Sequence, residues 1–507
     1  MANGTALQHV DVLIVGAGLS GIGMACHLTR ECPTKSYAIL EARDAIGGTW
    51  DLFKYPGIRT DSDMHTFGYD FKPWKSDISI VKADMIKDYV EEAAAEHDVT
   101  RHITFGRRVT DASWDSDTSL WTVTVREVVD GDPVGATSTM TCNWLQMCSG
   151  YYSYTDPYRP DFPGEERFGG EIVHPQFWPD HLQTAEQLDG KKIVVIGSGA
   201  TAVTLIPALA DLGADITMLQ RTPSWIFPAP AKNPISTVLR KALPEKYAYQ
   251  AVRKMNTWRT EMIYKKSRTA PDKVKKLLNK EVEKALDGSM EMDPHFTPSY
   301  NPWDQRLCLS PDGDLFAAIK AGRAHVATAT IDTFDETGIV LDDGSHLDAD
   351  VIVTATGLSL LTLGGVTPVV DGVEIDLSET FTYKGFMYSG VPNLATIFGY
   401  INASWTLRAD LIARYVCRMI NHLDESDASR ALPMLADHDM AERPYVDDFP
   451  AGYMLRGLHR MPKQGDRDPW IASQSYAHDK KVLLAPDADV DDGVVEFSSP
   501  VRATASA

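Results

Sequence analysis

The chain has 507 residues, of which 44% are hydrophobic and 23% are charged, so it can form two or three globular domains. Its formal net charge of -21 argues against a nucleic-acid partner, because so acidic a surface would repel phosphates. No apolar run of about 18 or more residues follows the short polar segment Met1–His9. We therefore expect no signal peptide, no transmembrane segment and a cytoplasmic protein.

The six cysteines include no C-x-x-C pair, which argues against a thioredoxin-type dithiol and against the usual zinc spacing. No metal site is predicted. Several cysteines lie in apolar runs, so we expect buried free thiols in a reducing compartment. The six are Cys26, Cys32, Cys142, Cys148, Cys308 and Cys417.

A dinucleotide-binding motif opens the chain. An apolar run at 10–15 ends in a G-x-G-x-x-G turn, a helical pattern continues to about Arg30, and Glu41 closes a second apolar run. The glycines let the backbone approach a pyrophosphate, which the helix N-terminus attracts, and the acid accepts hydrogen bonds from a ribose. The residues of this turn that we assign to the cofactor are Gly16, Gly18, Ser20 and Gly21.

A loop rich in aromatic and charged residues follows, through Gly47–Trp50 and Tyr55–Asp61. Such clusters after a nucleotide motif tend to line the site, although an ordinary surface loop is the alternative. Beyond it we expect an amphipathic helix at Lys82–Glu96 and a small sheet within His102–Glu127.

The segment Phe168–Pro179 separates this unit from a second one and carries Phe168, Gly170, His174 and Trp178. From its composition it is either a linker whose aromatic residues pack on a domain surface or a linker with a function.

The second unit repeats the first. An apolar run at 191–196 leads to a glycine turn with alanine in the third glycine's place, formed by Gly197, Ser198, Gly199, Ala200, Thr201 and Ala202. Glu41 lies 25 positions after the first glycine of its turn, and Arg221 lies 24 after Gly197. An acid in that slot suits a ribose hydroxyl, whereas an arginine suits a 2′-phosphate, so we expect NADP(H) here.

A basic helical segment interrupts the alternation of strands and helices. Between Lys232 and Asp287 there are 15 Lys and Arg against 6 Asp and Glu. We expect a helical insert with a solvated face, and a weak peripheral contact with anionic lipid stays open as the alternative. Further on, we expect a buried strand within 349–357 and an amphipathic helix at Thr406–Leu423. Trp405 and Phe386–Tyr388 are either pocket walls or core.

The segment from Phe168 to Pro179 fits F-x-G-x-x-x-H-x-x-x-W-P and resembles the fingerprint of the Baeyer–Villiger monooxygenases. These are class B flavoproteins that insert oxygen beside a ketone carbonyl. The sibling flavin-containing monooxygenases usually carry Tyr or Phe where this chain has Trp178. The similarity runs nearly end to end and looks closest to a mycobacterial branch, through Gly47–Trp50, Tyr55–Asp61, Gly197–Val203, Asn301–Leu309 and Asn402–Leu407.

The resemblance implies an α/β fold with two dinucleotide-binding, Rossmann-like domains and a helical insert. The expected limits are 1–165 with 370–507 for a discontinuous FAD domain, 166–230 with 300–369 for the NADP domain, and 231–299 for the insert. The family pattern places near FAD the residues Ser20, Glu41, Thr49, Trp50, Asp51, Leu52, Asp61 and Val109. It places near NADP the residues Arg59, Thr60, Asp61, Gly197, Ser198, Gly199, Ala200, Thr201, Ala202, Val203, Arg221 and Thr222.

Arg306 matches the family's active-site arginine and Asp61 the carboxylate that holds it. The implied reaction uses NADPH and O2 and turns ketones into esters or lactones through a flavin peroxide; thioethers and thioamides are further expected substrates. A fixed cation would stabilise the peroxide anion. His174 is expected to have a conformational role. The alternatives are an N- or S-oxygenating flavin monooxygenase, and an NADPH-consuming reductase or redox module.

Overall fold

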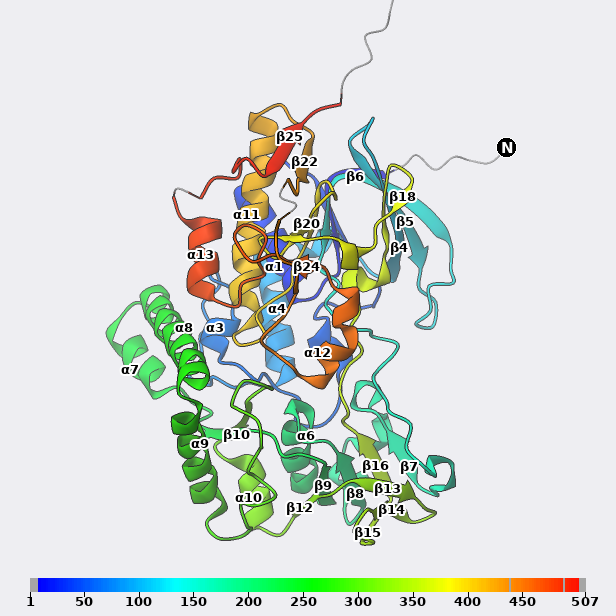
Figure 1. The fold of residues 1–507 in the computed structure, drawn as a ribbon, viewed down its shortest axis with the longest axis vertical. Coiled ribbons are helices and arrows are strands. Elements are labelled where there is room, and N and C mark those ends of the chain that lie inside the picture. Colours follow the sequence, from blue (N-terminus) through cyan, green and yellow to red (C-terminus); the bar gives the residue numbers. More distant parts are fainter. Residues whose placement is uncertain (1–7, 437–438, 487, 501–507) are drawn as a thin grey trace, which may run out of the picture.

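The computed structural model describes residues 8–436, 439–486 and 488–500. Two α/β units lie one above the other along the long axis, and three helices of an insert run along one side (Figure 1). Within the described ranges, no helix is both long and apolar enough to cross a bilayer. Of the N-terminal segment discussed above, residues 1–7 lie outside the described part.

The first unit is built on a nine-stranded mixed sheet. β1 runs parallel to β2 and β6, whereas β5 is antiparallel to both of its neighbours, β4 and β6. The second half of strand β1, Val12–Val15, is a continuous apolar run because both faces of the sheet are covered there, and Val12–Ile14 are fully buried. In sheet order the strands are β18 (Val373–Glu374), β17 (Pro368–Val370), β4 (Arg107–Asp115), β5 (Leu120–Glu127), β6 (Thr137–Met147), β1 (Gln8–Val15), β2 (Tyr37–Leu40) and β3 (Ile103–Thr104), with β21 (Leu394–Thr396) paired to β6.

The strands expected to form a separate small sheet therefore belong to this large one. The physical reason is that β6 pairs with β5 on one side and β1 on the other, so one hydrogen-bonded ladder joins them. Helices cover the sheet, and α1 packs on α11. They are α1 (Leu19–Glu31), α2 (Thr49–Leu52), α3 (Met64–Phe67), α4 (Ala83–Glu96), α11 (Trp405–Glu425) and α13 (Tyr476–Leu484).

The second unit has a five-stranded sheet in which all strands are parallel. In order these are β12 (Ala324–Thr328), β9 (Asp215–Gln220), β8 (Lys192–Ile196), β16 (Val351–Thr354) and β7 (Glu171–Val173). Helices α6 (Ala200–Asp211) and α10 (Asp314–Lys320) pack together on it. An antiparallel sheet of β13 (Ile331–Phe334), β14 (Gly338–Leu341) and β15 (His346–Asp348) supplies a second apolar cluster.

The predicted fold class is thus confirmed: an α/β protein with two dinucleotide-binding-type sheets and a helical insert. The domain limits stay a prediction. The fingerprint segment provides β7, the edge strand of the second sheet. There, Phe168 contacts Phe334 edge to face, and Trp178 Nε1 donates to Leu182 O at 2.9 Å.

The insert consists of α7 (Pro234–Ala242), α8 (Glu245–Thr269) and α9 (Pro271–Leu286). Arg253 of α8 is buried and donates to the backbone carbonyls of His65, Thr66 and Gly68, and it forms an ion pair with Asp410 of α11 at 3.1 Å. Helix α9 packs on α10 of the second unit. The insert therefore contacts both units.

Short elements complete the chain, and all six cysteines are free and buried, as predicted. The remaining strands are β10 (Ile226–Ala229), β11 (Cys308–Pro311), β19 (Thr382–Tyr383), β20 (Met387–Tyr388), β22 (Arg430–Pro433), β23 (Arg443–Pro444), β24 (Lys463–Gln464) and β25 (Val495–Ser498), and the remaining α-helices are α5 (Ala185–Leu188) and α12 (Gly452–Gly457).

Candidate active site

A cavity of about 680 Å³ lies between the two units and reaches both glycine turns. The first unit contributes Gly18 and Gly48, and the second contributes Gly197 and Gly199. In open α/β sheets, ligands bind outside the carboxyl ends of the strands, which is where both turns lie. One cavity that touches two such turns can hold two dinucleotides whose reactive ends meet.

The first turn is held by the strand that follows it. Gly16 N donates to Leu40 O at 2.8 Å, and the Glu41 carboxylate accepts hydrogen bonds from the backbone N–H groups of Ala17 (2.7 Å) and Arg43 (2.8 Å). Burial raises the pKa of Glu41, although these N–H groups oppose the rise. Glu41 thus fixes the turn from behind.

Two hydroxyl groups beside the first turn are already held in place. Ser20 Oγ accepts a hydrogen bond from Trp405 Nε1 at 2.8 Å, which joins the start of α1 to the start of α11. Thr49 Oγ1 lies 2.7 Å from the hydroxyl of Tyr152. All four side chains line the cavity. These two hydroxyl groups are therefore held by other side chains of the cavity wall.

The second turn leaves open space and a free cation. Gly197 has a φ of 128°, whereas Gly199 has an ordinary backbone and a Cβ built there would meet no atom within 4 Å. Ser198 Oγ donates to Thr222 O at 3.1 Å, which ties the turn to the end of β9. Arg221 is exposed on the cavity wall, and no carboxylate in the described ranges lies within ion-pair distance of it.

Asp61 and Arg306 meet on the wall of the same cavity. Arg306 Nη2 lies 2.6 Å from Asp61 Oδ2, and the side chains are 32% and 36% exposed. Asp61 comes from the loop between α2 and α3, and Arg306 precedes β11, so the pair joins the two units. Burial disfavours the charge, but Asp61, helped by Tyr453 and Tyr151, outweighs it and raises the pKa of Arg306.

Arg59 also crosses between the units. Its guanidinium forms an ion pair with Asp314 at the start of α10, and Nη2 lies 3.5 Å from Val203 O. Because its charge already has a partner, this arginine differs from Arg221 on the same wall.

The fingerprint histidine reaches the cavity too. His174 Nδ1 accepts the backbone N–H of Gln176 at 3.2 Å, and Nε2 is buried with no hydrogen-bond partner among the described residues. Burial lowers the pKa of His174 to about 4, and the contact with the Gly357 backbone does not offset this. The ring is therefore neutral at neutral pH.

The structure brings many of the predicted residues to this cavity and leaves others behind its wall. Those that line it are Gly18, Ser20, Thr49, Trp50, Arg59, Asp61, His174, Gly197, Ser198, Gly199, Ala200, Thr201, Arg221, Thr222 and Arg306. Those that do not are Gly16, Gly21, Glu41, Asp51, Leu52, Thr60, Val109, Phe168, Gly170, Trp178, Ala202 and Val203.

Some of the residues behind the wall support the site indirectly. Asp51 is buried beneath the loop and pairs with Arg43 at 2.6 Å and with Lys87 at 2.7 Å. Burial opposes its charge, but these cations prevail and lower the pKa of Asp51 to about 2. Val109 is buried in the core of the first sheet.

Aromatic residues far apart in the sequence form the rest of the wall. Tyr151 stacks on Trp405 with ring centroids 5.2 Å apart, and Phe398 and Tyr453 lie beside them. Trp405 is thus a wall residue, whereas Phe386 and Met387 are fully buried core. The sequence carries no periodic signal for Tyr453, because only the return of the C-terminal segment over the cavity brings it there.

Comparison with known proteins identifies the family. The family model "Flavin-binding monooxygenase-like" matches residues 9–443. The chain is 47% identical over 492 residues, 97% of this chain and 98% of the relative, to the FAD-containing monooxygenase EthA of Mycobacterium tuberculosis. It is 45% identical to the probable FAD-binding monooxygenase AlmA of Acinetobacter baylyi, over 97% of this chain and 96% of the relative. The chain belongs to the flavin-binding monooxygenase-like family and is a flavin monooxygenase, an oxidoreductase.

A solved structure supports the fold. A steroid monooxygenase bound to NADP superposes with a TM-score of 0.69 at 23% identity and covers 84% of this chain and 88% of its own. The resemblance to a mycobacterial branch that the motifs indicated is confirmed at the level of family.

Proposed function

We propose that this chain is a Baeyer–Villiger monooxygenase that uses FAD, NADPH and O2 to convert ketones into esters or lactones, and that also sulfoxidises thioethers and thioamides. The observation that carries this proposal is the Asp61–Arg306 ion pair, which lies on the wall of a cavity shared by both glycine turns.

The residues present fit both cofactors. For FAD, Gly18 and Thr49 offer a backbone approach and a fixed hydroxyl. For NADPH, the open space at Gly199 admits a pyrophosphate, and Arg221, which has no carboxylate partner among the described residues, suits the 2′-phosphate. When bound, the flavin accepts a hydride from NADPH and activates O2. The relatives named for FAD and the neighbour solved with NADP support this assignment.

Arg306 supplies a fixed positive charge to the cavity. Oxygen transfer to a carbonyl needs an anionic oxygen nucleophile, and a guanidinium stabilises such an anion more strongly in a site with little water. Arginine suits this task because it stays protonated and offers a planar fork of donors. The raised pKa of Arg306 keeps the guanidinium charged at neutral pH.

Asp61 holds that charge in position. A partly buried guanidinium is costly without a carboxylate, so Asp61 stabilises Arg306 and limits the rotamers that it can adopt. Because these residues belong to different units, correct placement of Arg306 requires that the two units meet as they do here.

The test is Arg306→Ala in the flavin-loaded protein. We expect ester formation, measured as incorporation of one oxygen atom by mass spectrometry, to fall on the order of a hundredfold to a thousandfold. Reduction of the flavin by NADPH without O2 should persist. The matched control is Arg323→Ala, since Arg323 pairs with Asp211 at 2.9 Å on the surface. Ester formation near the wild-type rate in Arg306→Ala would falsify the proposal.

The wild-type protein separates the alternatives in the same assay. Sulfoxide or N-oxide without any ester would indicate an N- or S-oxygenating monooxygenase. NADPH consumption without an oxygenated product would indicate a reductase or redox module. Asp61→Ala should keep flavin reduction but release more hydrogen peroxide per NADPH, and unchanged coupling would remove Asp61 from its role.

A further inference from the structure

Helix α7 exposes apolar side chains and buries a polar one. Ser236 is fully buried, whereas Ile235 and Val238 are 42% and 65% exposed. Surface helices of soluble proteins normally turn their apolar face inward. The exposed apolar side chains continue into α8 through Leu243 and Tyr247 to Trp258, of which the last is 62% exposed. We call these five residues, Ile235, Val238, Leu243, Tyr247 and Trp258, the α7–α8 surface.

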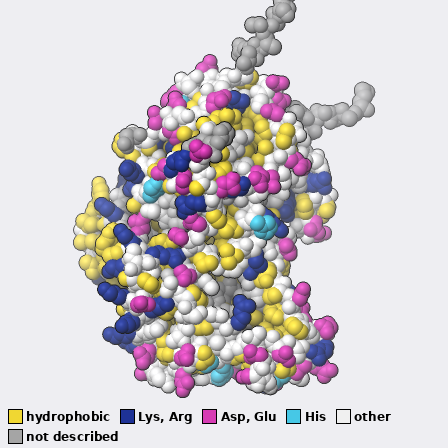
Figure 2. All heavy atoms as spheres, viewed as in Figure 1, with side chains coloured by type: hydrophobic (Ala, Val, Ile, Leu, Met, Phe, Trp, Pro, Cys, Tyr) yellow, Lys and Arg dark blue, Asp and Glu magenta, His cyan; other side chains and the backbone are white. Residues whose placement is uncertain are grey.

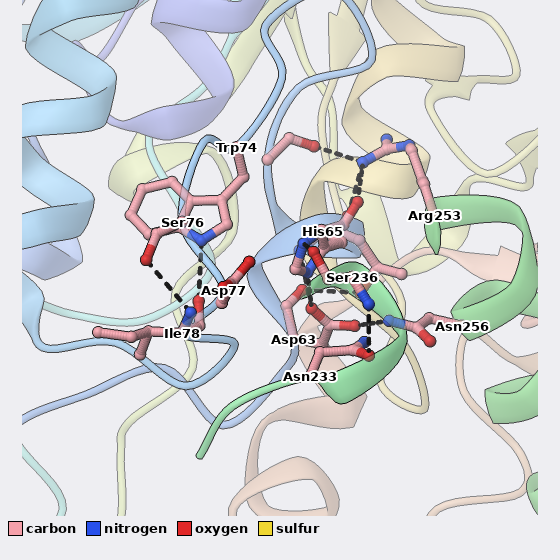
Figure 3. Close-up of polar contacts among 12 residues, drawn as sticks. Asp63, His65, Trp74, Ser76, Asp77, Ile78, Asn233, Ser236, Arg253 and Asn256 are labelled. Carbon is pink, nitrogen blue, oxygen red and sulfur yellow. Dashed lines mark hydrogen bonds and ion pairs between the residues drawn. The ribbon is translucent and has the colours of Figure 1, made fainter. Parts of the chain in front are cut away.

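Polar contacts fix this orientation from below (Figure 3). Ser236 Oγ lies 2.8 Å from His65 Nε2, and His65 Nδ1 lies 2.8 Å from Asp63 Oδ1. Asn256 of α8 donates to the same Asp63 carboxylate, and Asn233 caps α7 by accepting from Ile235 N and Ser236 N. Rotating α7 to hide its apolar face would leave buried polar groups unsatisfied.

Ser236, His65 and Asp63 are also arranged as a nucleophile, its base and the acid that orients the base would be. Ser236 is fully buried and does not line the cavity, so no substrate can reach it. The three residues therefore act as a clamp that joins α7 to the first unit.

Unpaired cations surround the exposed apolar residues. Figure 2 shows hydrophobic side chains bordered by Lys and Arg over the region of α7 and α8. Tyr247, Lys254, Trp258 and Lys265 follow one another along one exposed face of α8. Lys232, Lys241, Lys246, Lys254 and Lys265 are exposed, and none forms an ion pair with a carboxylate in the described ranges.

We propose that the α7–α8 surface lies on an anionic lipid surface. Exposed Tyr and Trp suit the boundary between headgroups and acyl chains, and lysines extend from there to anionic headgroups. Charge complementarity is local, because this basic face belongs to a chain of net charge -21. Protein–protein interfaces are depleted in lysine, so a second copy of the chain fits this surface less well.

The test is co-sedimentation of the full-length, flavin-loaded protein with phosphatidylcholine vesicles, with and without phosphatidylglycerol. We expect binding only with phosphatidylglycerol, weakened by salt because the charges are exposed. Val238→Asp and Trp258→Ser should lose binding. Lys241→Gln combined with Lys246→Gln should weaken it on the order of tenfold or more. The matched control is Val134→Asp, since Val134 is 71% exposed on the β5–β6 loop of the first unit.

Each other outcome overturns the proposal. It fails if wild-type protein stays in solution with anionic vesicles, or if Val238→Asp binds as wild type does. Equal loss in Val134→Asp would show that the effect is not local to the α7–α8 surface. Light scattering without lipid measures whether the protein is a dimer. A wild-type dimer that Val238→Asp converts to monomers would assign the surface to a second copy of the chain. Unchanged flavin content and melting temperature show that the variants are folded.

Discussion

Of the four arginines in the described ranges that line the cavity, Arg456 lies over the ring of Tyr158, and the other three differ in their partners in a way that indicates their roles. Arg306 pairs with Asp61, Arg59 pairs with Asp314, and Arg221 has no carboxylate within reach among the described residues. A paired guanidinium is held in position, whereas an unpaired one at the end of β9 is available for an incoming anion. Arg221 is therefore the residue we assign to the phosphate that distinguishes NADPH from NADH.

Arg221→Ala should remove that distinction. We expect the Michaelis constant for NADPH to rise on the order of tenfold to a hundredfold, because a charge-assisted hydrogen bond is lost. The constant for NADH should change little, so NADH is the internal control in a steady-state assay. An equal rise for both nucleotides would mean that Arg221 acts on the fold of the turn and does not contact the 2′-phosphate.

At this scale the sequence predicts residues whose neighbours in the motif fix their place. Arg221 follows from its offset after Gly197, and Asp61 and Arg306 follow from the motifs around them. Tyr453 could not be predicted, because it reaches Arg306 only after the C-terminal segment has folded back over the cavity. Tyr151, which follows β6, comes near Arg306 only because the two units meet at the cavity.

The two glycines of the second turn serve different purposes. At Gly197, φ is 128° and an added Cβ would lie 2.5 Å from Ala355 O, so the backbone itself requires glycine. At Gly199 the backbone is extended, with φ of -80°, and an added Cβ would meet nothing within 4 Å. The second glycine thus keeps space free for a ligand.

Alanine substitutions separate the two purposes. Gly199→Ala should keep the melting temperature of the wild type but weaken NADPH binding, because the methyl group occupies the space for the pyrophosphate. Gly197→Ala should lower the stability by roughly 1 to 3 kcal/mol through backbone strain. Thermal unfolding without nucleotide and NADPH titration measure the two effects. If Gly199→Ala binds NADPH as wild type does, the dinucleotide does not pass over this turn.

Elements with strong periodicity were predictable, and those defined by their neighbours were not. The core strands β1 and β8 and helix α11 follow from apolar runs and helical spacing. The pairing of the two-residue strand β18 with β17 depends on β17 joining β4 in the first sheet. The amphipathic pattern of α7 even suggests the wrong inner face, because the clamp at Ser236 outweighs it.

At the scale of the whole molecule, the site exists only where the two units meet. Asp61 and Arg59 of the first unit pair with Arg306 and Asp314, which belong to the second unit's side of the cavity. The chain between the units carries the fingerprint, whose strand β7 is fixed to the second sheet while His174 faces the cavity. We therefore expect a change in this segment to alter how the units are placed.

His174→Ala tests this placement. We expect flavin reduction by NADPH and the later oxygenation both to slow, on the order of tenfold to a hundredfold, because small displacements of reacting groups are costly. His181→Ala is the matched control, since His181 lies just after this segment, is exposed and pairs with Glu171. Stopped-flow spectra measure the two steps separately, and loss of oxygenation alone would assign His174 to the chemistry.

The pH dependence gives a second measurement on the same residue. With its pKa lowered to about 4, His174 is neutral in the folded protein, so the ratio of wild-type to His174→Ala rates should stay constant from about pH 6 to pH 8. In the unfolded chain His174 has its ordinary pKa of about 6.5, so as the pH falls the unfolded chain takes up this proton at a higher pH than the folded chain does. The contribution of His174 to the free energy of unfolding is therefore fully present above that pH and is lost as the pH falls towards 4. Over this pH range the melting temperature of the wild type should fall further than that of His174→Ala. If the two melting temperatures fall in parallel, the ring is not buried as described.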